Sequence, residues 1–188
     1  MHFGVLKMKL SLVSVALAAG LGLAAIGAHA SDGTITINGM VSAQTCTISG
    51  EGQGKDFTVT LPAVSTSALA VAGSTAGTTT FNIALTNCSP ADHGTASIYL
   101  ESGVNTLADG NLKNAAASGA TGVEVQILNG IDMTPMDASK GQYAQNSPMK
   151  FIVGGAANLP FAAQYVAPAG NATAGDVTTT VTYSIGYD

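Results

Sequence analysis

Apolar and polar residues alternate along many short stretches of this chain, and clusters of turn-forming residues separate these stretches. Residues 31–41 are typical, because Gly, Ile and Val occupy every second position and mostly Thr and Asn stand between them. Side chains of an extended strand point alternately to opposite faces, so this period of two predicts half-buried β-strands. The other predicted strands comprise residues 41–48, 57–61, 78–88, 96–100, 123–127, 149–153, 159–166 and 176–188. About eight short strands without an amphipathic helix between them indicate an all-β sandwich.

The segments between these strands carry residues that favour turns. Residues 63–77 are rich in Ala, Ser, Thr and Gly, which predicts a loop or a weak helix. Residues 106–114 predict a turn-rich excursion, and Asn129-Gly130 predicts a hairpin turn. Pro160 indicates an edge strand or the start of a strand, because proline lacks the N–H that a central strand donates.

The last predicted strand is long and strongly patterned. One face of residues 176–188 carries Val177, Thr179, Val181, Tyr183, Ile185 and Tyr187. We expect its free edge to pair with an extended segment, which residues 31–41 could supply. Pairing within the chain would give an ordinary secreted monomer, whereas pairing between molecules would give a polymer by β-strand addition. A hairpin turn at Asn38-Gly39 would instead fold residues 31–41 back on themselves.

Residues 1–30 have the features of a secretory signal peptide. Two lysines form a basic start, residues 10–26 are an uncharged apolar run, and residues 28–30 (AHA) are a small-residue cleavage site. A membrane anchor is the alternative, although a run rich in Ala and Gly is weakly apolar for a bilayer span. We expect cleavage after residue 30 and export, which leaves 158 of the 188 residues, enough for one domain.

The chain that remains after this cleavage is acidic. Its four lysines and eleven carboxylates, with no arginine, give a formal charge of −7. This balance disfavours binding to nucleic acid and to anionic membrane surfaces. The lack of arginine also removes the usual bidentate clamp for phosphate and carboxylate ligands.

The chain has two cysteines, Cys46 and Cys88. An even pair in an exported chain predicts one disulfide, and closing a loop of about 40 residues is worth about 4 kcal/mol in the chain-entropy model. The spacing matches neither CxxC nor a zinc-binding pattern, and His93 is the one histidine that remains after cleavage. We therefore expect no metal and no cofactor.

The chain lacks the constellation of catalytic groups that a secreted hydrolase would need, and we predict that it is not an enzyme. His93 stands beside Asp92, but a lone loop histidine is usually neither a ligand nor a general base. Residues 50–54 (GEGQG) have the glycines of a phosphate loop without the lysine and the helix that should follow. Tyr183 and Tyr187 could stack on a sugar, but their place in the apolar row favours packing in the core or in a groove.

Five segments of the chain occur in a recognisable order. They are residues 31–49 (SDGTITINGMVSAQTCTIS), FNIALTNC at the second cysteine, GVEVQILNG, LPFAAQYVA and the C-terminal strand. That strand has a penultimate tyrosine, Tyr187, and is preceded by Gly175, fourteenth from the end. In order and spacing these segments resemble the subunits of chaperone–usher fimbriae, the type 1 pilin-like family. The resemblance spans nearly the whole chain after residue 30.

The resemblance implies an incomplete immunoglobulin-like sandwich that lacks its last strand, which a neighbouring subunit supplies as a donor strand. Residues 31–41 would be the donor-strand extension and residues 42–188 the pilin domain, with Cys46 and Cys88 as the family's disulfide. The donated face would carry Gly33, Ile35, Ile37, Gly39 and Val41. The acceptor groove, which a chaperone also contacts, would carry Gly175, Val177, Val181, Tyr183, Ile185 and Tyr187.

The resemblance also implies partners and a location. The protein would be a structural subunit of an adhesive surface fimbria (pilus), with no catalytic activity. It would polymerise with copies of itself or with other fimbrial subunits, after passing through the periplasm with a chaperone and through an outer-membrane usher. The alternative is a self-complemented secreted β-sandwich that binds a carbohydrate or a receptor. A stable monomer with an intramolecular N-terminal strand would indicate this alternative.

Overall fold

The computed structural model describes residues 35–37, 43, 45–92 and 94–188. The chain divides into two units, Met1–Met40 and Val41–Asp188, and the fold belongs to the second. This second unit contains two sheets and two short 3-10 helices, η1 (Thr66–Leu69) and η2 (Gln142–Ala144). Among the described residues, no helix is both long and apolar enough to cross a membrane.

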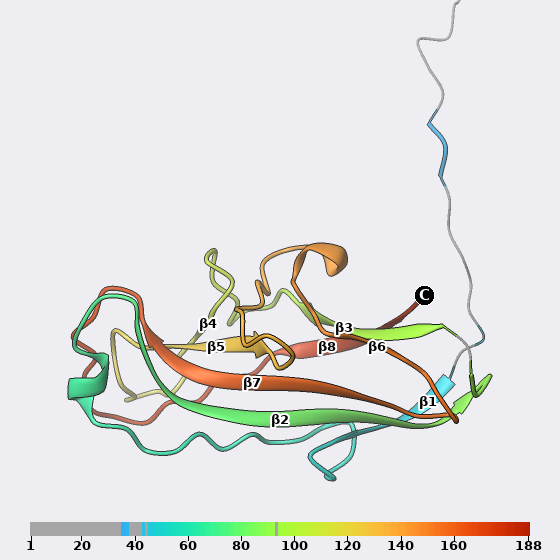
Figure 1. Cartoon of the computed structure of the whole chain (residues 1–188). Helices are drawn as coiled ribbons and strands as arrows, with labels where there is room; N and C mark the ends of the chain where they lie inside the picture. Colours follow the sequence, from blue (N-terminus) through green and yellow to red (C-terminus); the bar gives the residue numbers. More distant parts are fainter. Residues whose placement is uncertain (1–34, 38–42, 44, 93) are drawn as a thin grey trace, which may run out of the picture. The chain divides into compact units, whose positions relative to one another are not determined.

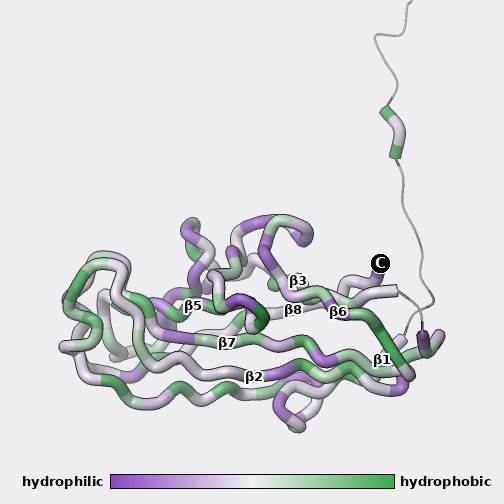
Figure 2. The backbone as a smooth tube through the Cα atoms, viewed as in Figure 1, coloured by the Kyte–Doolittle hydropathy of each residue, from purple (hydrophilic) through white to green (hydrophobic). Residues whose placement is uncertain are grey.

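Five antiparallel strands form the larger sheet. In spatial order they are β1 (Thr45–Gly50), β2 (Ser74–Ser89), β7 (Ala157–Ala167), β5 (Glu124–Asn129) and β4 (Leu112–Lys113). β2 and β7 lie side by side and pair from Ser74↔Ala167 to Leu85↔Ala157 (Figure 1). Hydrophobic and hydrophilic positions change at short intervals along both strands (Figure 2), which is the period of two that predicted them.

Three antiparallel strands form the smaller sheet, in the order β6 (Met149–Phe151), β3 (Thr95–Glu101) and β8 (Thr182–Tyr187). Inward side chains of both sheets form one core, and its largest buried members include Phe81, Leu85, Ile98, Leu100, Leu159 and Phe161. A disulfide joins Cys46 in β1 to Cys88 in β2, as the pair of cysteines predicted. The predicted all-β sandwich is therefore confirmed.

The prediction from Pro160 was wrong, because β7 is a central strand between β2 and β5. Pairing between β5 and β7 ends at Asn129↔Phe161, and the next amide along, that of Gly130, donates to the Pro160 carbonyl. The nitrogen of Pro160 points to the same side of the strand, beyond the end of β5. Proline thus loses one hydrogen bond at a place where the neighbouring strand has already turned away.

Two predicted strands extend further in the sequence than in the sheets. Residues 57–61 are extended but pair with no strand, and β8 begins only at Thr182, so residues 176–181 are also extended and unpaired. Side chains still alternate between half-buried and exposed along both segments. The pattern therefore predicted the backbone conformation correctly and the ladder pairing incorrectly.

Candidate functional site

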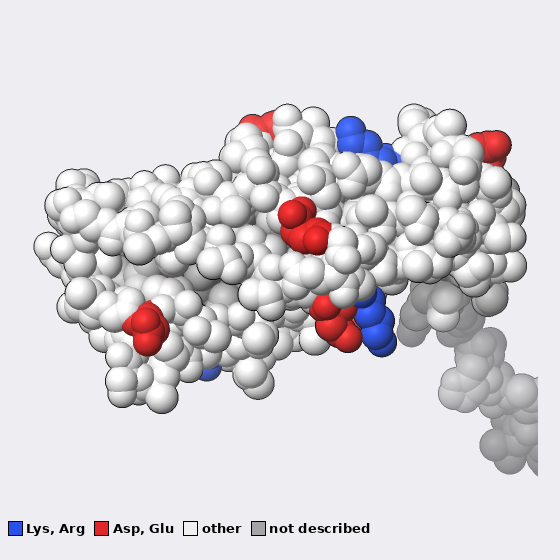
Figure 3. Space-filling view, turned by 90° about the horizontal axis from the view of Figure 1, so that it is seen from below, with Lys and Arg blue, Asp and Glu red and all other residues white. Residues whose placement is uncertain are grey.

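The two unpaired segments, residues 57–61 and 177–181, flank one groove. Their half-buried side chains are Phe57, Val59, Leu61, Val177, Thr179 and Val181, and all six line the same cavity. Charged residues are few and scattered on the face shown in Figure 3. Each segment thus presents an apolar row to the groove without a neighbouring strand to hydrogen-bond its backbone.

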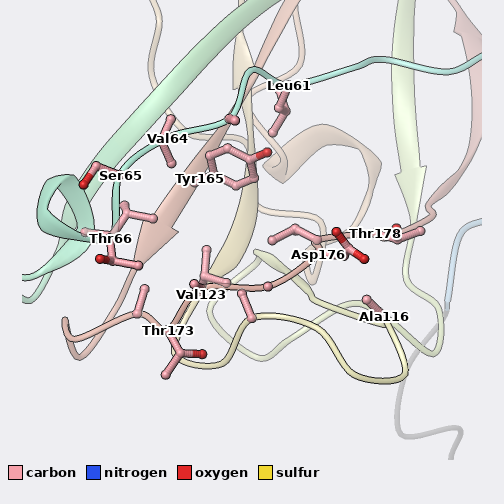
Figure 4. A pocket seen from close by; sticks show the side chains of 17 residues that line it. Leu61, Val64, Ser65, Thr66, Ala116, Val123, Tyr165, Thr173, Asp176 and Thr178 are labelled. Atoms are coloured by element: carbon pink, nitrogen blue, oxygen red, sulfur yellow. The ribbon is translucent and has the colours of Figure 1, made fainter.

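The groove contains two adjoining cavities that share part of their lining. The first, cavity A, measures about 550 Å³, and its floor comes from the larger sheet: Phe81, Leu112, Val125, Ile127 and Ala163. The second, cavity B, measures about 520 Å³, and its lining includes Val64, Leu69, Val123, Ala172 and Gly175 (Figure 4). The residues that line both cavities are Leu61, Tyr165, Val177 and Thr178, and we call these four residues the waist.

The backbone of β8 has one free edge, and that edge faces the groove. Asp188 and Thr95 exchange both amide hydrogen bonds, so even-numbered residues of β8 bond to β3 and the odd-numbered ones point away from it. Upstream, the Thr178 carbonyl accepts from the Ala115 amide on the outer side. Within the described part of the chain, the backbone groups of Val177, Thr179 and Val181 have no hydrogen-bond partner. A row of unpaired donors and acceptors therefore follows the apolar groove.

Aromatic side chains close the groove beyond cavity A. The Tyr183 hydroxyl donates to the Lys55 carbonyl at 2.6 Å, and its ring meets Phe57 edge-on, with centroids 6.2 Å apart. Burial raises the pKa of the Tyr183 phenol, and the negative charge of Asp56 adds to this. The Tyr183 ring thus connects β8 to the segment that precedes residues 57–61.

The groove also holds one buried polar atom that has no partner among the described residues, the hydroxyl oxygen of Thr179. Catalytic groups do not gather there: in the described part of the chain no three His, Cys, Asp or Glu side chains are placed to hold a metal ion. His93 lies outside the described residues. What this arrangement can do is accept an extended apolar segment and hydrogen-bond its backbone.

The profile of a protein family, described as type-1 fimbrial protein, A, matches residues 61–188. The chain belongs to the type-1 fimbrial protein family. It is 44% identical over 173 residues to the major fimbrial subunit SMF-1 of Stenotrophomonas maltophilia (strain K279a), covering 89% of this chain and 99% of that protein. It is 42% identical over 160 residues to the F17 fimbrial protein of Escherichia coli, covering 83% and 87%. A solved chaperone–usher pilus shares the fold with a TM-score of 0.56 at 20% identity, covering 84% and 96%.

These likenesses confirm the predicted family, the fold class and the structural role. This type-1 fimbrial protein is a structural subunit of an extracellular surface fimbria, where it assembles with other subunits, and its family is not enzymatic. A sandwich without its last strand is consistent with the fold of the solved pilus.

Three of the six predicted acceptor residues of this fimbrial protein line the groove. Val177 and Val181 line cavity A, and Gly175 lines cavity B. A Cβ at Gly175 would stand 2.5 Å from the Ala120 nitrogen, so glycine allows the loop that walls cavity B to approach. The other three, Tyr183, Ile185 and Tyr187, are half-buried on β8 and pack against the core rather than forming an exposed platform for a sugar.

Sequence reasoning missed the second wall and the waist of the groove. Phe57, Val59 and Leu61 alternate clearly in the sequence, but this pattern did not indicate that they would face an open edge. On the predicted donor face, Ile35 and Ile37 have exposed fractions of 88% and 89%. The remaining donor residues (Gly33, Gly39 and Val41) and the alternative turn at Asn38-Gly39 lie outside the described residues.

Proposed function

We propose that this fimbrial subunit polymerises by donor-strand complementation, with residues 31–41 of one copy filling the groove of the next. The observation that carries the proposal is the unpaired backbone edge of residues 177–187 beside the mainly apolar cavity A and the adjoining cavity B, whose lining mixes apolar and polar side chains. The donated face would be Gly33, Ile35, Ile37, Gly39 and Val41. Backbone hydrogen bonds would hold the strand, and alternate side chains would fill the cavities.

The length of the donor strand and the free energy of burying its side chains are compatible with its insertion into the groove. From residue 33 to residue 41 an extended strand spans about 26 Å, at about 3.3 Å per residue. Full burial of one Ile or Val side chain contributes about 2 kcal/mol. Because the donor of each copy enters a different surface of the next, the contact is head-to-tail and continues as a fibre instead of closing.

The waist suggests the direction of the donated strand. Gly39 has no side chain and would lie beside Val177, where the two cavities adjoin. Three alternate residues (37, 35 and 33) precede Gly39, and one, Val41, follows it. The free edge is long on the β8 side of Val177 and short on the side of Gly175, so the strand would run antiparallel to β8. Val41 would then fill cavity B, and Ile35 and Ile37 would fill cavity A.

The same groove gives a reason why secretion would need a chaperone and an usher. We propose that residues 1–30 are a cleaved signal peptide, residues 31–41 the donor-strand extension and residues 42–188 the pilin domain. An uncovered apolar edge is prone to aggregate. A periplasmic chaperone would cover the groove until an outer-membrane usher exchanges it for the extension of the next subunit.

The test compares the full chain with a chain that lacks residues 31–44. We expect the full chain to form SDS-resistant ladders on non-boiled gels, whereas the shortened chain, co-produced with its chaperone, should capture a peptide of residues 31–44 nearly irreversibly. A full chain that remains a stable monomer and ignores the peptide would contradict the proposal. In that outcome the N-terminal strand would belong to its own groove, as in a self-complemented binding module.

A further inference from the structure

The two ends of β2 lie at opposite ends of the sandwich (Figure 1). Its 16 residues span about 50 Å, at about 3.3 Å per residue. At one end Ser89 pairs with Thr45, the first residue of β1, so the chain enters the domain here, and we call this the entry end. At the other end the Ser74 amide donates to the Val71 carbonyl, close to η1 and cavity B, and we call this the η1 end.

The entry end exposes neighbouring apolar side chains. The turn between β6 and β7 packs against the end of β2, because Gly155 accepts from the Cys88 amide and donates to the Ala91 carbonyl. Phe151, the last residue of β6, and Val153, in this turn, have exposed fractions of 75% and 70%. The same stretch is hydrophobic in Figure 2. Single exposed apolar residues are common, whereas neighbouring ones form a patch of the kind that marks an interaction surface.

The η1 end has an uncharged surface. Residues 63–75 and 167–175 contain no charged residue. Val71 is 71% exposed, and Ala70 and Ala72 on either side of it are exposed as well. The turn that follows β7 lies beside them, because the Gly73 amide donates to the Ala167 carbonyl. A surface without charges loses little solvation when it is covered, so the η1 end is suited to contact with another apolar surface.

We propose that the entry end of one subunit packs Phe151 and Val153 on the Val71 surface of the copy that accepts its donor strand; this inference rests on the donor-strand proposal above. In that proposal Val41 fills cavity B, at the η1 end of the accepting copy. Thr45 follows Val41 by four residues, which span at most about 14 Å. The length of the chain therefore brings the entry end of the donating copy close to the η1 end of the accepting one.

This contact is a second junction between the same two copies. A donated strand followed by a short connection does not by itself fix how the two domains are oriented. Packing of the two apolar ends restricts that orientation and stiffens the fibre. A small contact is sufficient, because the donated strand holds the two ends together and makes their association effectively intramolecular.

The experiment uses fimbriae assembled from the full chain with Val71→Cys and Val153→Cys together, treated with a short bis-maleimide and boiled in SDS. We expect ladders that survive boiling, since crosslinks from the η1 end to the entry end continue from copy to copy, whereas untreated fimbriae should run as single subunits. The length of β2 excludes this crosslink within one copy. The matched control combines Val71→Cys with Ile131→Cys, because Ile131 is 55% exposed but follows Gly130, which bonds to Pro160 beside the middle of β2. It should give no ladder after boiling.

A second measurement uses charges in place of cysteines. Val71→Asp combined with Val153→Asp sets like charges at the proposed contact, and we expect these fimbriae to keep their ladders on non-boiled gels but to bend more sharply in electron micrographs. Val71→Lys combined with Val153→Asp should restore the stiffness. All three side chains are added at exposed positions, so the domain itself should fold normally.

The outcomes separate this inference from the proposed function. Ladders on non-boiled gels, without boiling-resistant ladders from the Val71/Val153 cysteine pair, would overturn the contact between the ends and leave donor-strand complementation standing. Equal crosslinking in the Ile131 control, or unchanged stiffness in the Asp/Asp variant, would also overturn it. A wild type that forms no ladders on non-boiled gels contradicts donor-strand complementation and this inference together.

Discussion

The outer face of the larger sheet and the groove beside β8 differ in whether their polar groups have hydrogen-bond partners. On the outer face, side-chain hydrogen bonds run without a break from β2 across β7 and β5 to Asn111, the residue before β4. Gln164 accepts from the Thr78 hydroxyl and donates to Gln126, which donates to Asn111. Asn111 in turn donates to the carboxylates of Asp109 and Glu124. In the groove, by contrast, backbone groups and the Thr179 hydroxyl have no partner within the described chain.

The difference separates what folds the subunit from what joins it to another. A buried polar group without a partner costs about 1–3 kcal/mol, so a chain selected only for its own folding would pair such groups. The outer face does so, even at Gln164, which is 9% exposed. The groove leaves its groups unpaired along one continuous line. We therefore expect substitutions on the outer face to change folding, and substitutions on the donor face to change assembly.

The largest effect is expected from Ile37→Asp on the donated face. The carboxylate would be buried without a partner in the neighbour's groove, at a cost of several kcal/mol. We expect assembly to stop, as measured by fibre length in electron micrographs and by SDS-resistant ladders. Thr36→Asp, which places the same charge on the opposite face of the strand, is the matched control and should still assemble. Fibres of normal length from Ile37→Asp would sink donor-strand complementation.

A smaller effect with the opposite selectivity is expected from Gln164→Met. Methionine keeps the shape of the side chain but leaves the Thr78 hydroxyl and the Gln126 amide oxygen unpaired, so the free energy of unfolding should fall by about 1–3 kcal/mol. Denaturant unfolding of the full chain measures this loss, and Thr78→Val, which breaks one bond, should lose less. Ladder formation should not change. A variant that folds normally but fails to assemble would contradict the separation of the two regions.

The alternation in the sequence predicted the extended segments of both regions but did not predict which of them would pair in a sheet. Alternation predicted the inward rows of β2, β7 and β8, because burial on one face imposes a period of two. It could not distinguish a paired strand from an unpaired one, and so residues 57–61 were expected to lie in a sheet. The polar chain from Thr78 to Glu124 was missed for a related reason, since Gln and Asn on an outer face normally indicate solvent.

Pro160 is a second position where the local sequence did not predict which strand pairs with which. Proline is disfavoured in a central strand only where a neighbouring strand would accept its N–H. Pairing between β5 and β7 ends at Phe161, so Pro160 has no such neighbour. The waist and the Tyr183 ring depend on contacts between segments more than 100 residues apart, such as Lys55 with Tyr183. No local pattern encodes such contacts.

The tyrosines around the groove should make the subunit sensitive to alkaline pH. Burial raises the pKa of the Tyr165, Tyr183 and Tyr187 phenols above their ordinary value of 10.0. The unfolded chain therefore loses these protons at a lower pH than the folded one, and the stability present below about pH 10 should decline as pH rises beyond it. Unfolding by denaturant between pH 8 and pH 11 measures this decline, which Tyr183→Phe should reduce. A stability that rises over this range would contradict the assignment.

The smallest effect is expected from Thr179→Val, which removes the unpartnered hydroxyl of the groove while keeping the branched shape. A buried hydroxyl without a hydrogen bond is unfavourable, so the free energy of unfolding of the full chain should rise by about 1 kcal/mol or less. Thr78→Val, at a hydroxyl that does have a partner, should lower it. These two Thr→Val changes are chemically identical, so opposite signs would show that the two regions differ in hydrogen-bond satisfaction rather than in composition. Equal losses in both variants would mean that the Thr179 hydroxyl already has a partner in solution, and the contrast between groove and outer face would then rest on the backbone edge alone.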